Sequence, residues 1–352
     1  MSSHSWRVAR EKKDTPFFLL FPAIVAARYQ ELHTAFSPLA ANFKICYSVK
    51  TNPHPRILST LNDLGSGMET VSERELQAVA PFSTFKLFNA CAATPKEMAE
   101  ANAQGAHIIL DSPSQLEMMA SQEIIPHHAG IRVRLFPSKF GFSPAEVKPF
   151  IQECHSRGIT ITLLHSHPGT NVSIQDYERF ASRLAGLLPD LPQIETIDLG
   201  GGIPGPHGLK QRGHSVNEYA RILSIHLGQF LSQKTLILEP GRFLVEDAMV
   251  LITVVQHLKE VDDHSYVFLD AGINVLPKIT FSPYVFKPLS PSHGTKKNVR
   301  LAGPLMFGSD ELGKIHASLA PGDRIVVENV GAYCTELAWR LSRDAPNIVV
   351  VE

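Results

Sequence analysis

The sequence predicts an α/β protein that combines a (β/α)8 barrel with a C-terminal β domain of sandwich-like or barrel-like form. Eight short apolar runs alternate with helical segments between Lys44 and Leu238, which is the number of strands that such a barrel requires. These runs are apolar along their length, as expected for parallel strands that are buried on both faces. After about Val250 the long helical patterns stop, and strand patterns separated by Gly and Pro turns follow.

The N-terminal segment reads as a strand over Phe17–Phe21 and a helix from Pro22 to about Phe36, with the proline at the first helical position. Basic residues followed by the apolar run Pro16–Ala27 give this segment the look of a signal peptide. Acidic residues interrupt the basic part, and the helical pattern continues past the expected cleavage point. We therefore expect a cytoplasmic protein, with secretion as the alternative.

The barrel is expected to span residues 22–250. Its eight predicted strands are 44–50, 67–71, 86–89, 107–110, 131–135, 159–164, 196–199 and 235–238. Helix-start signals lie between them, at Pro55, Ser72, Thr94, Ser112, Ser143, Ser173 and near Val216. Ser72 and Glu75 have the spacing of a capping box. A doubly wound open sheet is the alternative architecture.

The β domain is expected to span residues 251–352 and to be joined by the N-terminal segment 1–21. The predicted strands of this region are 250–256, 266–270, 298–301, 324–328 and 348–351. They have the apolar and β-branched composition typical of strands, and turn residues separate them.

Composition narrows the classes of function. There are 33 Lys and Arg residues against 34 Asp and Glu, a net charge of -1, and no concentrated basic stretch, which argues against nucleic-acid binding. The four cysteines have neither metal-ligand spacing nor the density of a disulfide framework, so we expect no metal site and a reducing compartment. Apart from the N-terminal run, the apolar runs are too short to span a bilayer.

Lys50 is the first candidate for chemistry. It ends the apolar run of Tyr47 and Val49, and Asn52-Pro53 prevents the strand from continuing. A lysine at the carboxyl end of a barrel strand can form a Schiff base with a carbonyl cofactor if burial or neighbouring cations lower its pKa. A solvated lysine at a strand end is the alternative reading of this stretch alone.

The other predicted strand ends are also polar, and the carboxyl ends of barrel strands are where active sites lie. The residues found there are Lys50, Glu69, Asn89, Asp111, Arg134, His165, His167, the run Gly200-Gly201-Gly202, Glu239 and Arg242. A glycine run lets backbone N–H groups approach a phosphate, and an arginine can hold the phosphate bidentately. The residues alone therefore indicate a barrel enzyme with a phosphate-bearing ligand.

Six motifs in order along nearly the whole chain resemble those of the fold-type III pyridoxal-phosphate decarboxylases, the group of ornithine, arginine and diaminopimelate decarboxylases with an alanine-racemase-like barrel. The motifs are Tyr-Ser-Val-Lys-Thr-Asn (47–52), Ser-Lys-Phe-Gly (138–141), His-Ser-His-Pro-Gly-Thr (165–170), Leu-Gly-Gly-Gly (199–202), Glu-Pro-Gly-Arg (239–242) and Gly-Ala-Tyr (331–333).

The resemblance implies pyridoxal 5'-phosphate as the cofactor and decarboxylation of an amino acid as the reaction. It makes Lys50 the Schiff-base lysine, His167 the histidine that stacks on the cofactor ring, and Glu239 the acid that pairs with the pyridine nitrogen and stabilises a quinonoid. His165 keeps the reading of a core histidine. The remaining cofactor contacts that we expect are Glu69, Arg134, Thr170, Gly201, Gly202, Gly241, Arg242 and Tyr333.

Two departures from the family pattern concern the substrate. Met306 stands where these enzymes usually carry a cysteine that protonates the product, in a segment that ends at Asp310; the donor would then be Lys50, a water or Cys334. The stretch from Lys278 through Tyr284 to Lys287 lacks the acidic residue that family members acting on diamino acids carry there, and Lys278 lies near the position where members acting on a substrate with a distal carboxylate use arginine. We therefore expect an acidic or carboxylated substrate tail, as in an amino-acid conjugate of siderophore biosynthesis, unless Lys278 is only a surface charge.

The resemblance further implies a head-to-tail homodimer, with the Met306–Asp310 segment acting in the neighbouring subunit's site. Two other functions remain open from the sequence. One is an amino-acid racemase on the same fold, which the glutamate at position 239 disfavours. The other is a catalytically silent homologue that regulates a partner, which the replaced cysteine leaves open.

Overall fold

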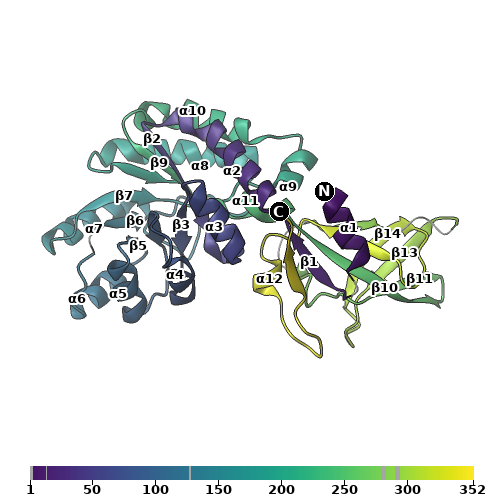
Figure 1. Ribbon diagram of the computed structural model, residues 1–352. Coiled ribbons are helices and arrows are strands. Elements are labelled where there is room, and N and C mark those ends of the chain that lie inside the picture. The colour runs from purple at the N-terminus through teal and green to yellow at the C-terminus, as the bar shows by residue number, and fades with distance from the viewer. Residues whose placement is uncertain (1–2, 13, 127, 279–282, 290–293) are drawn as a thin grey trace. The chain divides into compact units, whose positions relative to one another are not determined.

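The computed structural model describes residues 3–12, 14–126, 128–278, 283–289 and 294–352. The chain divides into two compact units. One, the barrel domain, is Ala26–Leu244, and the other, the β domain, is formed by Met1–Val25 together with Val245–Glu352. Figure 1 shows the strands and helices of each.

The barrel domain contains a closed barrel of eight parallel strands that follow one another in chain order. They are β2 (Asn42–Ser48), β3 (Gly67–Thr70), β4 (Lys86–Phe88), β5 (His107–Leu110), β6 (Ala129–Arg132), β7 (Ile161–His165), β8 (Thr196–Asp198) and β9 (Thr235–Leu238). Pairing of β2 with β9 closes the barrel. The predicted (β/α)8 barrel is therefore confirmed, and the open doubly wound sheet is not formed.

Side chains from alternate positions of the strands fill the barrel interior. One buried apolar cluster there consists of Cys46, Leu87, Ile109, Leu163 and Ile237, which come from five different strands. A packed interior leaves the strand ends as the place where a ligand can bind.

Helices lie on the outside of these strands in Figure 1. They are α2 (Pro22–Phe36), α3 (Pro55–Asp63), α4 (Glu73–Val79), α5 (Pro95–Ala103), α6 (Pro113–Ser121), α7 (Pro144–Ser156), α8 (Ile174–Leu187), α9 (Pro206–Gln211), α10 (Val216–Leu231) and α11 (Arg242–Val245). Proline stands at the first helical position of α3, α5, α6 and α7. Proline has no backbone N–H, and at this position no hydrogen bond within the helix is lost by its absence.

The short 3₁₀ segments are η1 (Ser37–Leu39), η2 (Val49–Thr51), η3 (Leu188–Asp190) and η4 (Glu246–Ala248). The segment η2 changes one prediction, because β2 ends at Ser48 and Lys50 lies in the turn that follows. Asn52 donates its backbone N–H to the carbonyl of Val49 and closes this turn. Lys50 therefore stands just beyond its strand.

The β domain contains an eight-stranded sheet in the order β12-β15-β10-β11-β13-β14, with β1 paired to β10 and β16 paired to β1. Its strands are β1 (Phe17–Leu20), β10 (Met249–Val261), β11 (His264–Leu269), β12 (Val285–Pro288), β13 (Lys297–Ala302), β14 (Glu311–Ala317), β15 (Arg324–Glu328) and β16 (Asn347–Val350). The helices α1 (Ser3–Glu11) and α12 (Cys334–Leu337) accompany it.

The N-terminal strand belongs to this sheet, as predicted. Strand β1 pairs antiparallel with β10, with Phe17 opposite Ile252, and parallel with β16. All four of its residues are buried. Helix α2 then runs through Val25, Ala26 and Ala27 without a break. None of the described helices has the length and apolar character needed to cross a membrane.

Candidate active site

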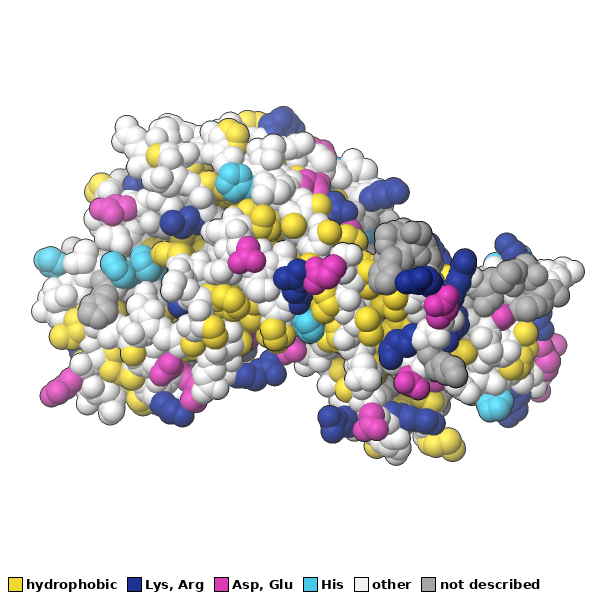
Figure 2. Space-filling view, viewed as in Figure 1, with side chains coloured by type: hydrophobic (Ala, Val, Ile, Leu, Met, Phe, Trp, Pro, Cys, Tyr) yellow, Lys and Arg dark blue, Asp and Glu magenta, His cyan; other side chains and the backbone are white. Residues whose placement is uncertain are grey.

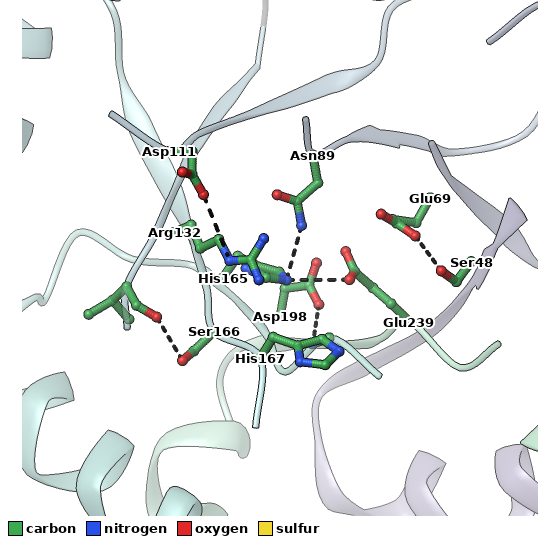
Figure 3. A network of polar contacts seen from close by, with 12 residues as sticks. Ser48, Glu69, Asn89, Asp111, Arg132, His165, Ser166, His167, Asp198 and Glu239 are labelled. Atoms are coloured by element: carbon green, nitrogen blue, oxygen red, sulfur yellow. Dashed lines mark hydrogen bonds and ion pairs between the residues drawn. The ribbon is translucent and has the colours of Figure 1, made fainter. Parts of the chain in front are cut away.

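Each of the eight barrel strands carries a polar side chain within two residues of its carboxyl end, and Figure 3 labels all of these residues except Lys50. In strand order these residues are Lys50, Glu69, Asn89, Asp111, Arg132, His165, Asp198 and Glu239. Because parallel strands of a closed barrel all end on the same face, these side chains share one mouth. The predicted clustering of polar strand ends is thus present in the barrel domain.

Lys50 and Glu69 form an ion pair at this mouth. Nζ of Lys50 lies 2.8 Å from Oε1 and 2.7 Å from Oε2 of Glu69. The Lys50 side chain is 43% exposed, whereas that of Glu69 is 1% exposed. Ser48 donates its hydroxyl to Oε2 of Glu69 at 2.6 Å and fixes the carboxylate. The sequence argument required burial or neighbouring cations at Lys50. The structure shows a half-exposed Lys50 side chain beside a carboxylate instead.

Glu239, His165 and Asn89 form a second polar group. Nε2 of His165 lies 3.3 Å from Oε2 of Glu239 and 3.2 Å from the side-chain amide of Asn89. His165 and Glu239 are 0% and 4% exposed. Oε1 of Glu239 is buried and has no hydrogen-bond partner among the described residues. A buried carboxylate oxygen without a partner is costly, so this atom points to a missing donor.

The pKa of Glu239 is held below its ordinary value. Burial alone raises it, but the charge and hydrogen bond of His165, together with the charge of Lys50, lower it further than burial raises it. Glu239 is therefore ionised at neutral pH. A carboxylate that keeps its charge in a buried site is suited to bind a protonated nitrogen.

His167 follows the same strand and is neutral. Burial, followed by the electrostatic influence of the neighbouring His165, lowers the pKa of His167 to about 3. Its Nδ1 accepts the backbone N–H of Gly169 at 3.0 Å, which leaves the ring proton on Nε2. The ring lies against Gly200, where a Cβ atom would approach Cδ2 of His167 to 2.7 Å. The ring is thus held in one orientation and one tautomer.

Glycine is required twice in the loops around these side chains. Gly202 has a φ of +96°, and a Cβ there would lie 2.5 Å from the carbonyl oxygen of Gly169. At Gly241 a Cβ would lie 2.0 Å from Oγ1 of Thr51. Only backbone fits at these positions, which is the property of loops that approach a phosphate closely. Arg242 follows Gly241 and is 6% exposed.

Arg132, which the sequence argument missed, lies in the polar network where Arg134 was predicted (Figure 3). Nε of Arg132 is 3.9 Å from Oδ1 of Asp111. Arg134 instead donates to the carbonyl of Gly141 and lies 3.5 Å from Glu146. The reason is that β6 ends at Arg132 and not at Leu135 as predicted. The arrangement favours Arg132 over Arg134 as a site residue.

Asp198 is a second residue that sequence reasoning missed. It ends β8, directly opposite His165 of β7 in the strand register. Its Oδ1 accepts the backbone N–H of Gly200 at 2.9 Å. A sequence signal for Asp198 was present, because this residue directly precedes Leu199 and the glycine run. Asp198 was overlooked because it lay inside the predicted strand 196–199 and not at its end.

The predicted substrate residues lie in the β domain. Lys278 donates to the carbonyl of Ser309 at 3.4 Å and is exposed, and Met306 is 99% exposed. Part of the stretch between Lys278 and Tyr284, residues 279–282, lies outside the described residues. The hydroxyl of Tyr284 donates to the carbonyl of Pro277 at 2.8 Å. Tyr333 caps α12 with a φ of +66°.

Asp310 has a structural position. It is 3% exposed, and its carboxylate accepts the backbone N–H groups of Ile273 and Leu305, each at 2.8 Å. Gly272 and Gly303 pack so closely against it that a Cβ at either position would clash with its oxygens. This favours a role in holding two loops together over the predicted contact with substrate.

Comparison with known proteins identifies the family. Residues 23–246 match the family described as pyridoxal-dependent decarboxylase, pyridoxal binding domain. The chain is 26% identical over 379 residues to a diaminopimelate decarboxylase of Methanothermobacter thermautotrophicus, covering 96% of this chain and 86% of that protein.

Solved structures share the fold at lower identity. The diaminopimelate decarboxylase of Helicobacter pylori complexed with L-lysine has a TM-score of 0.88 at 24% identity, and the superposition covers 97% of this chain and 93% of that chain. The lysine/ornithine decarboxylase of Vibrio vulnificus complexed with putrescine also has a TM-score of 0.88, at 20% identity, and covers 100% and 99%.

The matched segment contains the whole barrel, and the barrel mouth carries the lysine, the neutral histidine and the ionised carboxylate described above. The chain therefore belongs to the family of pyridoxal-dependent decarboxylases and is a carboxy-lyase that uses pyridoxal 5'-phosphate to decarboxylate an amino acid.

Proposed function

We propose that this enzyme decarboxylates an amino acid with an acidic or carboxylated tail, and that Lys50, His167 and Glu239 are its catalytic residues. The observation that carries the proposal is the barrel mouth itself. There Lys50 is paired with Glu69 at 2.7 Å, and a charged Glu239 has one oxygen without a partner among the described residues.

The residues fit pyridoxal phosphate. Oε1 of Glu239 lacks a donor in the described structure, and a protonated pyridine nitrogen is such a donor. Two glycine positions leave room only for backbone, as a phosphate cradle requires. The residues that we assign to the phosphate are Thr170, Gly201, Gly202, Gly241, Arg242 and Tyr333. When bound, the cofactor supplies an electron sink for the electrons of the breaking bond between Cα and the carboxylate.

Lys50 is the residue that we assign to the cofactor carbonyl. Its Nζ must lose a proton before it can attack a carbonyl carbon. Glu69 contacts Nζ with both carboxylate oxygens, and is therefore the nearest acceptor for that proton. Ser48 keeps Glu69 in this position through its hydroxyl.

His167 is assigned to the cofactor ring. Its low pKa keeps the imidazole uncharged at neutral pH, so the ring can pack against an aromatic ring without placing a second positive charge beside a pyridinium. The contact with Gly200 and the hydrogen bond from Gly169 fix the plane of the imidazole. This fixed plane prepares one face of the binding site in advance.

The acidic tail is inferred from Lys278. Its ammonium group donates to the backbone carbonyl of Ser309. Lys278 therefore lies beside the loop that runs from Met306 to Asp310. Relatives of this chain are named diaminopimelate decarboxylases, and diaminopimelate has a carboxylate at its far end. A carboxylated tail is thus compatible with the cation at position 278, and a conjugate of the siderophore type belongs to the same chemical class.

Kinetics on a panel of amino acids tests this substrate class. Carbon dioxide release is measured with diaminopimelate, glutamate and carboxylated conjugates, and with lysine and ornithine. We expect the highest kcat/KM for a substrate with a distal carboxylate. Lys278→Ala should raise its KM about tenfold, whereas Lys287→Ala, which removes a cation paired with Glu328 at 2.7 Å, should not. Highest efficiency with lysine or ornithine would reject the acidic tail.

We further propose a homodimer in which the Met306 loop acts in the partner's site. The support is an apolar surface on the β domain made of Met306, Phe307, Leu337, Trp339 and Leu341, which are 39% to 99% exposed. Hydrophobic side chains lie among basic and acidic ones on the lower edge of the β domain in Figure 2, where Figure 1 shows the segment after α12. A cytosolic location remains our prediction from the scattered cysteines.

A further inference from the structure

Two carboxyl groups share one buried cluster at the barrel mouth. Asp198 ends β8 and Glu239 follows β9, the neighbouring strand. One nitrogen of His165 and one carboxylate oxygen each of Asp198 and Glu239 lie within 4.8 Å of one another. Asp198 is 0% and Glu239 4% exposed. Figure 3 shows the three side chains converging.

Two buried carboxyl groups this close do not both ionise, because each charge disfavours the other where water is excluded. Their surroundings decide which one keeps the proton. Glu239 contacts His165 and lies in the field of Lys50. Asp198 accepts the N–H of Gly200 through Oδ1, and a hydrogen bond between its carboxyl group and that of Glu239 raises the pKa of Asp198 and lowers that of Glu239.

The electrostatics agree with this geometry. Burial, followed by the negative charge of Glu239, raises the pKa of Asp198 well above its ordinary value. The pKa of Glu239 is lowered instead, since His165 and Lys50 outweigh its burial. The other titratable groups whose charges act on this cluster from neighbouring elements are Cys46, Glu69, Lys50, His165 and His167.

We propose that Asp198 is a positioning residue of the cofactor site, which holds a proton at neutral pH so that Glu239 alone carries the negative charge, and which fixes the backbone of Gly200. The proposal deepens the function proposed above, because it rests on Glu239 as the partner of the cofactor nitrogen.

Gly200 connects Asp198 to the rest of the site. Its N–H is held by Asp198, and its carbonyl accepts the N–H of Glu239 at 2.8 Å. With a φ of +61° it lies against the ring of His167. Asp198 therefore acts on both side chains that we assign to the cofactor ring. It leaves the negative charge on Glu239, and it holds the Gly200 backbone against which the His167 ring packs.

Infrared spectroscopy of the holoenzyme at pH 7 tests where the proton lies. A protonated carboxyl group gives a C=O band that ionised carboxylates and amides lack. Every variant is made in a Glu75→Gln background, because Glu75 has a pKa of about 7 and would give a second such band. In that background we expect the band to be lost in Asp198→Asn and kept in Glu239→Gln. Asp111→Asn is the matched control, because Asp111 is a buried strand-end acid with the Arg132 guanidinium 3.9 Å away, and it should keep the band. Loss of the band in Glu239→Gln, or its survival in Asp198→Asn, overturns the proposal.

Cofactor binding tests the positioning role. Asparagine keeps an acceptor for Gly200 and imitates a neutral acid, so the dissociation constant of pyridoxal phosphate for Asp198→Asn should stay within about threefold of the wild type. Asp198→Ala removes the acceptor and should weaken binding about tenfold or more. If Asp198→Asn weakens binding as much as Asp198→Ala does, the carboxyl group must be charged and the proposal fails.

The nitrogen-15 resonance of ring-labelled pyridoxal phosphate separates this proposal from the function on which it rests. The resonance reports protonation of the ring nitrogen, which depends on whether Glu239 keeps its negative charge. We expect a protonated nitrogen in the wild type and in Asp198→Asn, and an unprotonated one in Glu239→Gln. An unprotonated nitrogen in the wild type would reject the role proposed for Glu239, whereas one in Asp198→Asn alone would reject the role proposed for Asp198.

Discussion

Glu75 illustrates how one buried acid can control stability near neutral pH. It is 5% exposed, and its Oε2 accepts the backbone N–H of Val71 at 2.9 Å. Because of this contact, Ser72 and Glu75 form only half of the predicted capping box. Burial, followed by the charge of Glu69, raises the pKa of Glu75 from 4.5 to about 7. The neutral form is thus favoured in the folded protein.

An acid whose pKa is raised on folding stabilises the protein below its unfolded pKa, and this contribution is lost as pH rises through the folded value. Glu75 should therefore lower the free energy of unfolding progressively between about pH 4.5 and pH 7. Glu75→Gln keeps the acceptor for Val71 and should be more stable than the wild type by up to about 3 kcal/mol at pH 8, with little gain near pH 4.5. Thermal melts across pH measure this, and a gain that does not change with pH would contradict it.

Met306 bears on the proton donor. A thioether cannot donate a proton, and Cys334, the alternative suggested by the sequence, is 0% exposed and has its Sγ 3.3 Å from the hydroxyl of Tyr284. Lys50 or a water molecule then remains as the candidate proton donor. If the missing donor limits the reaction, Met306→Cys should raise kcat about tenfold and slow inactivation during turnover. Met306→Ala is the control. If Met306→Cys has the same kcat and the same rate of inactivation as Met306→Ala, the missing donor does not limit the reaction.

The location of single residues at the barrel mouth was predictable where a motif fixed them. Lys50, Glu69, His167 and Glu239 all lie at the barrel mouth, as their motifs indicated. The arginine was misassigned because the sixth strand was placed too far along the chain. After Arg132 the backbone leaves the barrel, and the N–H of Arg134 bonds to the carbonyl of Phe142. No local pattern marks that departure.

At the scale of elements, the barrel strands were predictable and two strands of the β domain were not. Strand β14 was missed because its alternation is weak and Gly313 interrupts it. Strand β12 has four residues, and Pro288 is one of them. Proline is tolerated because β12 is at the end of the sheet order, where one side of the strand needs no hydrogen bonds. Edge position is a property of the assembled sheet and is absent from the local sequence.

Glycines inside two helices give a test of packing at this scale. Gly186 in α8 and Gly228 in α10 have no atom within 4 Å of a Cβ position and have helical backbone. Alanine should stabilise each helix by about 1 kcal/mol and raise the melting temperature by about 2 °C. Gly67→Ala is the contrast, because its Cβ would lie 2.7 Å from Sγ of Cys46, and it should destabilise the protein. A lower melting temperature for either helix variant would contradict the described packing.

At the scale of the whole molecule, the sequence predicted a barrel and a β domain, and the β domain carries an exposed apolar surface that includes Phe307 and Trp339. Phe307 and Trp339 contact each other edge to face, with ring centroids 6.1 Å apart. Large apolar side chains clustered on a surface are typical of an interface. The sequence pattern could not show this, because the two residues lie on separate loops.

Sedimentation analysis tests the proposed dimer. The wild type should sediment as a dimer, and Trp339→Glu should raise the dimer dissociation constant by about a hundredfold, because a charge would be buried in the interface. Ile125→Glu is the control, since Ile125 is 64% exposed in the barrel domain, and it should not change the association state. A wild-type monomer at micromolar concentration would contradict the proposed homodimer.

The central claim is that the barrel mouth binds pyridoxal phosphate through Lys50. The most direct measurement is borohydride reduction of the purified protein, followed by mass spectrometry of its peptides. We predict a visible absorbance band that disappears on reduction and a cofactor mass on the peptide that contains Lys50. The label should be absent in Lys50→Ala and present in Lys44→Ala, which alters a lysine of β2, the strand that precedes Lys50, and whose Nζ lies over the ring of Phe85. A colourless protein that added pyridoxal phosphate does not restore, or a label on another lysine, would contradict the account.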